Sequence, residues 1–465
     1  MGTLATILPG SRGGVIDLGS RLELFVDDYL IERMRGLSLE LQAPVPREVV
    51  MTFDRAWEGP GAAFYSVFQD GENFRLYYRG ARAKSRTVSM FEHACCAKST
   101  DGIRWVRPKL GQCHFGRSTA NNIVWDGIGG HNFAPFKDTN PDCATDQRYK
   151  ALASKGKHAL FAFVSPDGFA WKLLRRDPVV DGTLPNMFDS QNLAFWDAER
   201  GYYVMFLRCR REGVRNVMVC TSSDFANWTE PQWVDFGEAP SEELYTNAVT
   251  PYYRAPHIFM GFPMRFLPNR KKIAEHPYPG LSDTQFMTSR DGGKSWLRRQ
   301  DAFLRPGPMP ERWSQRSNLV AWGILETGPE LASMPNELSI YSHENYAADP
   351  CRLRRHTLRI DGFVAVHAAQ RGGELLSRPL RFTGDELVIN YATSAAGSVR
   401  VEIRDDAGKP IPGYTLRACP EIYGDEIDHV VTWRGGSDVS QLAGQVVRLR
   451  FVLQDTDLFS LRFRA

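Results

Sequence analysis

The chain has 465 residues, 43% of them hydrophobic and 24% charged, which is an ordinary composition for a globular protein of two or three domains. Its formal net charge of +3 gives no support for a nucleic-acid partner, and no apolar run approaches the roughly 18 residues that a membrane span needs. The eight cysteines show no metal-ligand spacing, so we expect reduced thiols, no bound metal and no cofactor.

The N-terminal segment, residues 1–56, comes before the first repeated unit of the chain. Residues 1–20 lack a basic stretch followed by an apolar core, so no intact signal peptide is predicted. The compartment stays open between a bacterial cytoplasm and a periplasmic or secreted location. The strand-like run Arg21–Tyr29 follows, and we expect Arg21–Pro44 to supply a strand that closes the next domain.

A signature of Ser, Asp, usually Gly, and Trp recurs four times along the chain, with Phe225 in place of Gly in the third copy. The copies begin at Ser99, Ser165, Ser222 and Ser289, each with Asp two residues later and Trp six or seven residues later. Asp and Gly favour a tight turn, and a buried Trp ring anchors it. The pattern resembles the Asp-box, which implies turns on the outer rim of propeller blades. We therefore expect these Asp residues to hold turns and to catalyse nothing.

The spacing of the copies predicts the architecture. Each copy follows a strand-like run, and the units around them read as 57–110, 121–178, 186–235 and 241–300, with a fifth unit of the same strand pattern at 308–366. Five units of four strands predict an all-β fold, a five-bladed β-propeller over residues 57–370. Alternating apolar and polar residues after Gly372 predict a C-terminal β-sandwich over residues 371–465, which we expect to brace the propeller.

The stretches before the first strand of each blade are the candidate site. In a propeller these strands line a central channel, so the stretches should meet at one of its mouths. They are unusually polar for innermost strands, and buried polar groups need partners. The partners are either a polyhydroxylated ligand or the neighbouring blades, bonded so as to close the ring. The predicted lining residues are Trp57, Glu58, His131, Asn132, Asp189, Gln191, Asn192, Glu243, Tyr245, Asn247, Glu311, Arg312, Trp313 and Arg316.

This architecture resembles the five-bladed propeller glycoside hydrolases, the invertase-like fructosidases and the arabinanase-like enzymes. The runs Leu24–Tyr29 and Phe188–Asn192 also resemble stretches shared by a group of family 32-like bacterial proteins. The resemblance implies hydrolysis of an oligo- or polysaccharide, in which one carboxyl group protonates the leaving oxygen and another acts as nucleophile or base. By blade position, Glu58 or Asp189 is the expected nucleophile or base and Glu243 the expected proton donor. Trp57 and Trp313 are expected to stack on sugar faces.

Two other functions stay open. A sialidase-like hydrolase of an acidic sugar would use a cluster of arginines and a tyrosine, and a mouth dominated by arginine would favour it. The residues available for that cluster are Arg79, Arg265, Arg312 and Arg316, with Tyr245. A non-catalytic carbohydrate-binding propeller is the second alternative. The sequence leaves open the sugar, the linkage, the stereochemical outcome, exo or endo action, a structural calcium and the oligomeric state.

Overall fold

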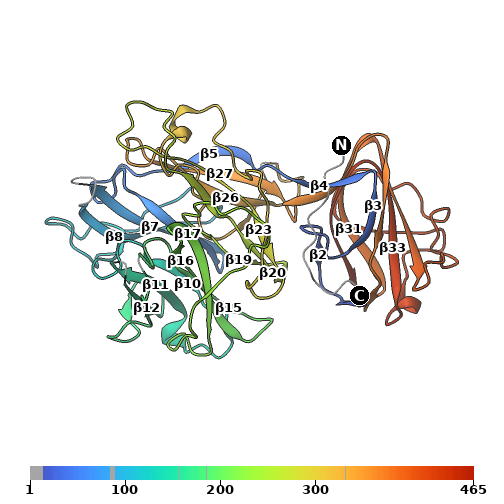
Figure 1. Ribbon diagram of the computed structural model, residues 1–465, viewed down its shortest axis with the longest axis horizontal. Helices are drawn as coiled ribbons and strands as arrows, with labels where there is room; N and C mark the ends of the chain where they lie inside the picture. The colour runs from blue at the N-terminus through green and yellow to red at the C-terminus, as the bar shows by residue number, and fades with distance from the viewer. Residues whose placement is uncertain (1–13, 84–88, 157, 185, 330) are drawn as a thin grey trace. The chain divides into compact units, whose positions relative to one another are not determined.

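A computed structural model gives the fold and describes residues 14–83, 89–156, 158–184, 186–329 and 331–465 (Figure 1). In these ranges the regular structure is almost entirely β. Three short 3₁₀ helices are present: η1 (Thr145–Gln147), η2 (Pro310–Trp313) and η3 (Ser440–Leu442). The chain divides into two compact units. One comprises residues 44–252 and 256–358, and the other comprises the segment up to residue 43, residues 253–255 and residues 359–465.

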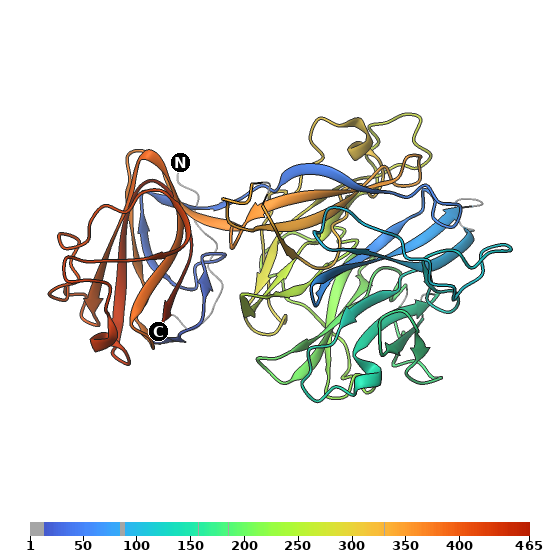
Figure 2. The same cartoon turned by 180° about the vertical axis from the view of Figure 1, so that it is seen from behind.

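The first unit is a five-bladed β-propeller, as the sequence predicts (Figures 1 and 2). Each blade is a sheet of four strands; the second gains β14, and the fourth is interrupted by the hairpin β21–β22. The strands of the first two blades are β6 (Ala63–Asp70), β7 (Asn73–Ala83), β8 (Ser89–Ser99) and β9 (Ile123–Trp125), then β10 (Ala134–Lys137), β11 (Tyr149–Lys155), β12 (Ala159–Ser165), β13 (Lys172–Leu173) and β14 (Val180–Asp181).

The third, fourth and fifth blades repeat this arrangement, and the fifth is completed by a strand from the start of the chain. Their strands are β15 (Leu193–Asp197), β16 (Tyr202–Arg211), β17 (Val214–Ser222) and β18 (Gln232–Trp233); β19 (Thr250–Tyr252), β20 (Ala255–Gly261), β21 (Met264–Leu267), β22 (Leu281–Thr284), β23 (Met287–Ser289) and β24 (Leu297–Arg298); and β25 (Leu325–Thr327), β26 (Glu337–Glu344), β27 (Arg352–Arg359) and β5 (Val45–Thr52).

The strand that closes the propeller is β5, which pairs antiparallel with β27, so the N-terminal segment does close the ring. The expectation that Arg21–Pro44 contains this strand is wrong. Strands β3 (Ile31–Arg35) and β4 (Leu37–Leu41) of that segment pair instead with β29 (Gly373–Ser377) and β28 (Val364–Ala368) of the second unit. Both segments have strand-like sequences, and the sequence alone does not say which partner each one takes.

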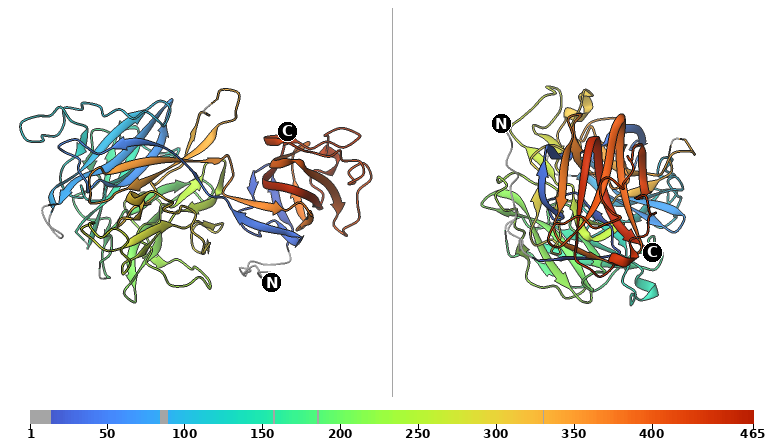
Figure 3. Two further views of the ribbon diagram at one scale, coloured as in Figure 1. Left: turned by 90° about the horizontal axis from the view of Figure 1, so that it is seen from above. Right: turned by 90° about the vertical axis from the view of Figure 1, so that its right-hand side faces the viewer.

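The second unit is built on one hydrogen-bonded sheet of ten strands (Figure 3). Its longest strands, β31 (Glu386–Asp405) and β33 (Val447–Arg464), pair along most of their lengths. Along β33 one face is buried and the other is partly exposed, which places a core on one side of the sheet. The remaining strands are β1 (Ile16–Gly19), β2 (Glu23–Leu24), β30 (Leu380–Phe382) and β32 (Asp425–Val430).

The four repeated Ser-Asp turns follow the third strands of the first four blades and share one hydrogen-bond pattern. In the first turn, Asp101 Oδ1 accepts the backbone N–H groups of Ile103 and Arg104, each at 2.8 Å. The Trp105 indole N–H donates to the Gly102 carbonyl at 3.1 Å. Asp167, Asp224 and Asp291 accept equivalent backbone bonds in the other turns. These carboxylates are committed to backbone amides, which is a structural role.

Candidate active site

Hydrogen bonds close the ring of blades at the entrances to the first strands. Asn132 Nδ2 donates to the Ser190 carbonyl at 2.5 Å, which joins the second and third blades, and Ser190 Oγ donates to the Tyr245 carbonyl at 2.7 Å, which joins the third and fourth. Thr284 Oγ1 donates to the Asn318 carbonyl at 2.5 Å. The Trp322 N–H donates to the Tyr65 carbonyl at 2.8 Å, between the fifth and first blades. These bonds link entrances of neighbouring blades from the second round to the first, and we call the region that they border the channel mouth.

Three of the predicted ligand-binding amides serve this ring instead. Asn132 also bonds Ser154 and the Phe188 carbonyl, and Asn192 Nδ2 donates to the Phe188 and Ser190 carbonyls at 3.1 and 2.9 Å. Gln191 Nε2 reaches the Tyr65 carbonyl at 3.1 Å in the first blade. All three side chains are buried. Asn132 and Gln191 bond other blades, as the interblade alternative describes, whereas the Asn192 bonds lie within the third blade.

Glu58 lies in a closed, buried network. Its carboxylate accepts the Tyr78 hydroxyl at 2.5 Å, Arg107 Nε and Nη2 at 2.6 and 3.0 Å, and the Arg55 N–H at 3.1 Å. The side chain is 0% exposed. A carboxylate with this set of partners holds the loop before β6 in place and has no accessible oxygen for a substrate. We therefore leave Glu58 out of the catalytic set proposed below.

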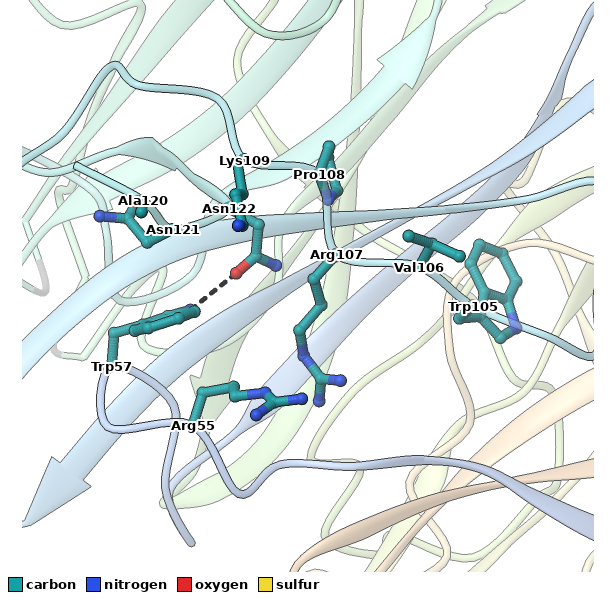
Figure 4. Close-up of a pocket in the computed structure, with 10 residues that line it drawn as sticks. All are labelled: Arg55, Trp57, Trp105, Val106, Arg107, Pro108, Lys109, Ala120, Asn121 and Asn122. Carbon is teal, nitrogen blue, oxygen red and sulfur yellow. Dashed lines mark hydrogen bonds between the residues drawn. The ribbon is translucent and has the colours of Figure 1, made fainter. Parts of the chain in front are cut away.

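Trp57 lines a pocket in the first blade of about 470 Å³ (Figure 4). Its indole N–H donates to Asn122 Oδ1 at 2.6 Å, drawn as the dashed line in the figure. Arg55, Arg107 and Lys109 also line this pocket. Its polar groups Arg107 and Asn122 are already paired, with Glu58, Tyr78 and Cys96.

Three of the predicted site residues, Glu311, Arg312 and Trp313, come from the fifth blade. Glu311, Arg312 and Trp313 form η2. Arg312 is buried, donates to Asn318 Oδ1 at 3.0 Å and lies 3.7 Å from the Glu344 carboxylate. The Trp313 indole N–H donates to the Gly307 carbonyl at 2.7 Å. Arg312 is thus a core arginine, and no contact places Glu311 or Trp313 at the mouth.

Glu243 is held by two arginines. Arg215 Nη1 lies 2.9 Å and Arg210 Nη1 lies 3.7 Å from its carboxylate oxygens, and the Arg215 N–H donates to it at 3.0 Å. Both carboxylate oxygens of Glu243 thus face arginine side chains, so we leave Glu243 out of the catalytic set proposed below.

Asp189, His131 and Glu92 remain partly accessible at the mouth. Their side chains are 37%, 36% and 29% exposed. Asp189 Oδ2 lies 3.0 Å from Arg208 Nη2, and His131 Nδ1 lies 3.0 Å from Glu92 Oε1. The bond from Asn132 to Ser190 ties together the chain neighbours of His131 and Asp189. The structure thus brings two carboxylates and an imidazole to adjoining entrances.

Tyr346 lies between two arginines at the same mouth. Its hydroxyl oxygen is 3.0 Å from Arg316 Nη1 and 3.3 Å from Arg79 Nη2, and both nitrogens donate to it. Burial alone raises the pKa of the Tyr346 phenol, but Arg79 and Arg316 outweigh burial and lower the pKa below its usual value. The Arg316 guanidinium also stacks 4.8 Å from the centre of the Tyr245 ring, which fixes Tyr245 as a wall of the site.

Non-glycine residues in the left-handed region mark these entrances. Phe64, Phe188, Ala248, Arg316 and Asn318 have φ of 57°, 65°, 43°, 56° and 67°. Such conformations cost about 1–3 kcal/mol each and concentrate at functional sites. Phe188, Ala248, Arg316 and Asn318 precede the first strands of the third, fourth and fifth blades, and Phe64 is the second residue of β6.

Four residues of the mouth were absent from the predicted site residues: Arg79, Glu92, Arg208 and Tyr346, although Arg79 was named in the sialidase alternative. Arg79 and Arg208 lie on β7 and β16, the second strands of their blades, and each strand carries two further arginines. The sequence therefore does not separate these two arginines from the others of the same strands. Glu92 and Tyr346 carry no distinguishing signal either.

Within the described ranges, no group of three or more His, Cys, Asp or Glu side chains is arranged to hold a metal ion. No helix in the same ranges is long and apolar enough to cross a membrane.

No family model and no curated protein matches the chain. Solved structures that resemble it include a fructofuranosidase from Schwanniomyces occidentalis, at 9% identity over 89% of this chain and 96% of the other, with a TM-score of 0.41. An endo-arabinase from Bacteroides thetaiotaomicron is 10% identical over 69% and 98%, with a TM-score of 0.41. An N-acetylgalactosamine deacetylase from F. plautii is 12% identical over 70% and 95%, with a TM-score of 0.45.

Proposed function

We propose that the protein is a glycoside hydrolase whose active site is the mouth around Asp189, His131 and Glu92. The observation that carries this proposal is the bond from Asn132 to Ser190, which brings the entrances of the second and third blades together. Near this bond, the Asp189 and Glu92 carboxylates and the His131 imidazole are partly exposed. The neighbouring amide side chains, those of Asn132, Gln191 and Asn192, are buried. Hydrolysis of a glycosidic bond needs a pair of carboxyl groups that flank it.

In this proposal, Asp189 is the nucleophile or the base. The ion pair with Arg208 orients its carboxylate, as either role requires. Asp189 would attack the anomeric carbon or accept the proton of the attacking water, while the bond from that carbon to the leaving oxygen breaks. Asp189 is the one member of the original catalytic set whose surroundings suit its predicted role.

Glu92 and His131 would deliver the proton to the leaving oxygen. The Glu92 carboxyl oxygen and His131 Nδ1 are 3.0 Å apart, so one proton can lie between them. Arg79 Nη1 lies 3.2 Å from the same ring nitrogen and holds the imidazole in place. Glu92 Oε1 lies 4.0 Å from Arg79 Nη1.

The sialidase-like alternative shares the arginines and the tyrosine of this mouth, but the propeller has five blades, whereas sialidases usually have six. A carbohydrate-binding propeller without catalysis would keep the same walls and release no product.

A hydrolysis screen tests the proposal. Wild type, Asp189→Asn and Glu92→Gln would be compared on furanosides, pyranosides and plant and algal polysaccharides, with the exposed residues Asp301→Asn and Glu72→Gln as matched controls. We expect wild type and both controls to release product and the two site variants to lose at least about 100-fold in kcat. Equal rates in Asp189→Asn would remove Asp189 from catalysis. If the protein binds sugars but releases product from no substrate, the result would favour the carbohydrate-binding propeller over the glycoside hydrolase.

A further inference from the structure

Among the described residues, the channel mouth holds three arginines and the two carboxylates of Asp189 and Glu92. The arginines are Arg79, Arg208 and Arg316, and the Arg208 side chain is only 2% exposed. Asp189 pairs with Arg208, and its charge also acts on Arg316. Glu92 lies 4.0 Å from Arg79 but bonds His131 more closely. Burying a guanidinium group without a negatively charged partner costs free energy, so we expect a further negatively charged group at this mouth.

Hydrogen-bond donors of these arginines are also unused. Nε and Nη1 of Arg208 and Nε of Arg316 are buried without a hydrogen-bond partner among the described residues. The same holds for Nδ2 of Asn247 and Oγ1 of Thr246, at the adjoining entrance of the fourth blade. An unmade bond at a buried donor costs about 1–3 kcal/mol, and more for a charged group. A ligand that brings acceptor oxygens would recover this energy.

The surrounding residues fix the positions of both arginines. The Arg316 guanidinium is stacked on the rings of Tyr245 and Tyr346, at 4.8 and 5.0 Å. Arg208 bonds the backbone carbonyl and the carboxylate of Asp189. A guanidinium held in this way suits the paired oxygens of a carboxylate or a sulfate, because its planar N–H groups match their spacing.

We propose that the substrate carries an anionic group, the carboxylate of a uronic acid or a sulfate ester, which Arg208 and Arg316 bind beside Asp189. This inference rests on the proposed function only in taking the ligand to be a carbohydrate. The anionic group would accept from the Arg208 nitrogens that have no hydrogen-bond partner among the described residues, Nε and Nη1, which places the sugar next to the Asp189 carboxylate.

Calorimetric binding with defined probes tests the inference separately from turnover. Glucuronate, galacturonate and glucose 6-sulfate would be compared with neutral glucose and galactose on the full chain. We expect at least one charged sugar to bind at least tenfold more tightly than its neutral counterpart, and higher salt to weaken that preference. Preference for the uronates or for the sulfate ester identifies the anion. Equal binding of charged and neutral sugars, or binding of none, overturns the inference.

Variants locate the anion. Arg316→Met and Arg208→Met should each remove the preference for the charged sugar. Arg104→Met is the matched control, because Arg104 is 89% exposed on the turn after β8, at the far end of the blade from the mouth. Arg316→Lys keeps the charge but loses the paired geometry, so it serves if a methionine variant does not fold, and it should lose most of the preference. An unchanged preference in the folded Arg316 variants refutes the assignment.

The two proposals fail in different ways. If charged sugars bind but are never hydrolysed, the anion site stands and the glycoside hydrolase proposal fails. If neutral glycans are hydrolysed and charged ones are not preferred, the glycoside hydrolase proposal stands and the anion site fails.

Discussion

The buried ion pair of Glu58 and Arg107 gives the sharpest prediction, because the sequence suggested a catalytic role and the structure shows a structural one. Four donors surround the Glu58 carboxylate, which is 0% exposed, whereas Arg107 is 18% exposed. Removing one partner of a buried pair costs about 3–5 kcal/mol. Glu58→Gln leaves the charge on the more exposed partner, so we expect about 3 kcal/mol, the low end of that range.

Arg107→Met should cost more, about 5 kcal/mol, because it strands a carboxylate that water cannot reach. The double variant should lose less stability than the sum of the two single variants, since it leaves neither charge alone. Urea unfolding followed by tryptophan fluorescence measures these losses, and it reports mainly on the propeller because all tryptophans except Trp433 lie in that unit.

The control for this cycle is the exposed pair of substitutions Glu72→Gln and Arg104→Met, each expected to change stability by less than about 0.5 kcal/mol. The reasoning would be refuted if Glu58→Gln kept wild-type stability and yet abolished product release. That result would return Glu58 to the catalytic set.

Three further predictions concern the repeated turns and the mouth. A Cβ on Gly102 would lie 2.7 Å from a side chain of the fifth blade, whereas at Gly71, also left-handed, nothing lies within 4 Å. Gly102→Ala should therefore lose about 1–3 kcal/mol more than Gly71→Ala in urea unfolding, and equal losses would contradict the packing. Burial raises the pKa of Asp224, but hydrogen bonds from the following residues lower it to about 2, so its stabilising effect is present above about pH 4 and is lost as the pH falls toward 2. Asp224→Asn should be less stable than wild type at pH 6 and equal to it near pH 2, and a constant difference would contradict this. Absorbance titration at 295 nm should show one tyrosine ionising below pH 10 that is missing in Tyr346→Phe and titrates at higher pH in Arg316→Met; identical curves would contradict the pairing.

The propeller was predictable because its repeats are local. Each Ser-Asp turn fixes the end of a third strand within a few residues, so the four copies placed four blades, and the repeated strand pattern added the fifth. The closing strand was harder to place, because Val45–Thr52 and Leu37–Leu41 are both strand-like segments whose partners lie more than 300 residues away. Neighbouring sequence carries no information about that choice.

The site was predictable only as a region. His131 and Asn132 are adjacent polar residues at the same entrance, yet one is 36% exposed at the mouth and the other is buried against the next blade. Successive side chains in extended backbone point to opposite sides, and which side faces the channel is a tertiary property. Glu58 illustrates the same limit, since its partner Arg107 is 49 residues away.

Chemical rescue at Asp189 tests the central claim most directly. Asp189→Ala would be assayed on whichever glycan wild type hydrolyses, with and without added azide or formate, beside Asp301→Ala as control. The account predicts that the small anion restores part of the lost rate of Asp189→Ala, because it takes the place of the missing carboxylate, and leaves the control unchanged. Full activity of Asp189→Ala without any added anion would contradict it.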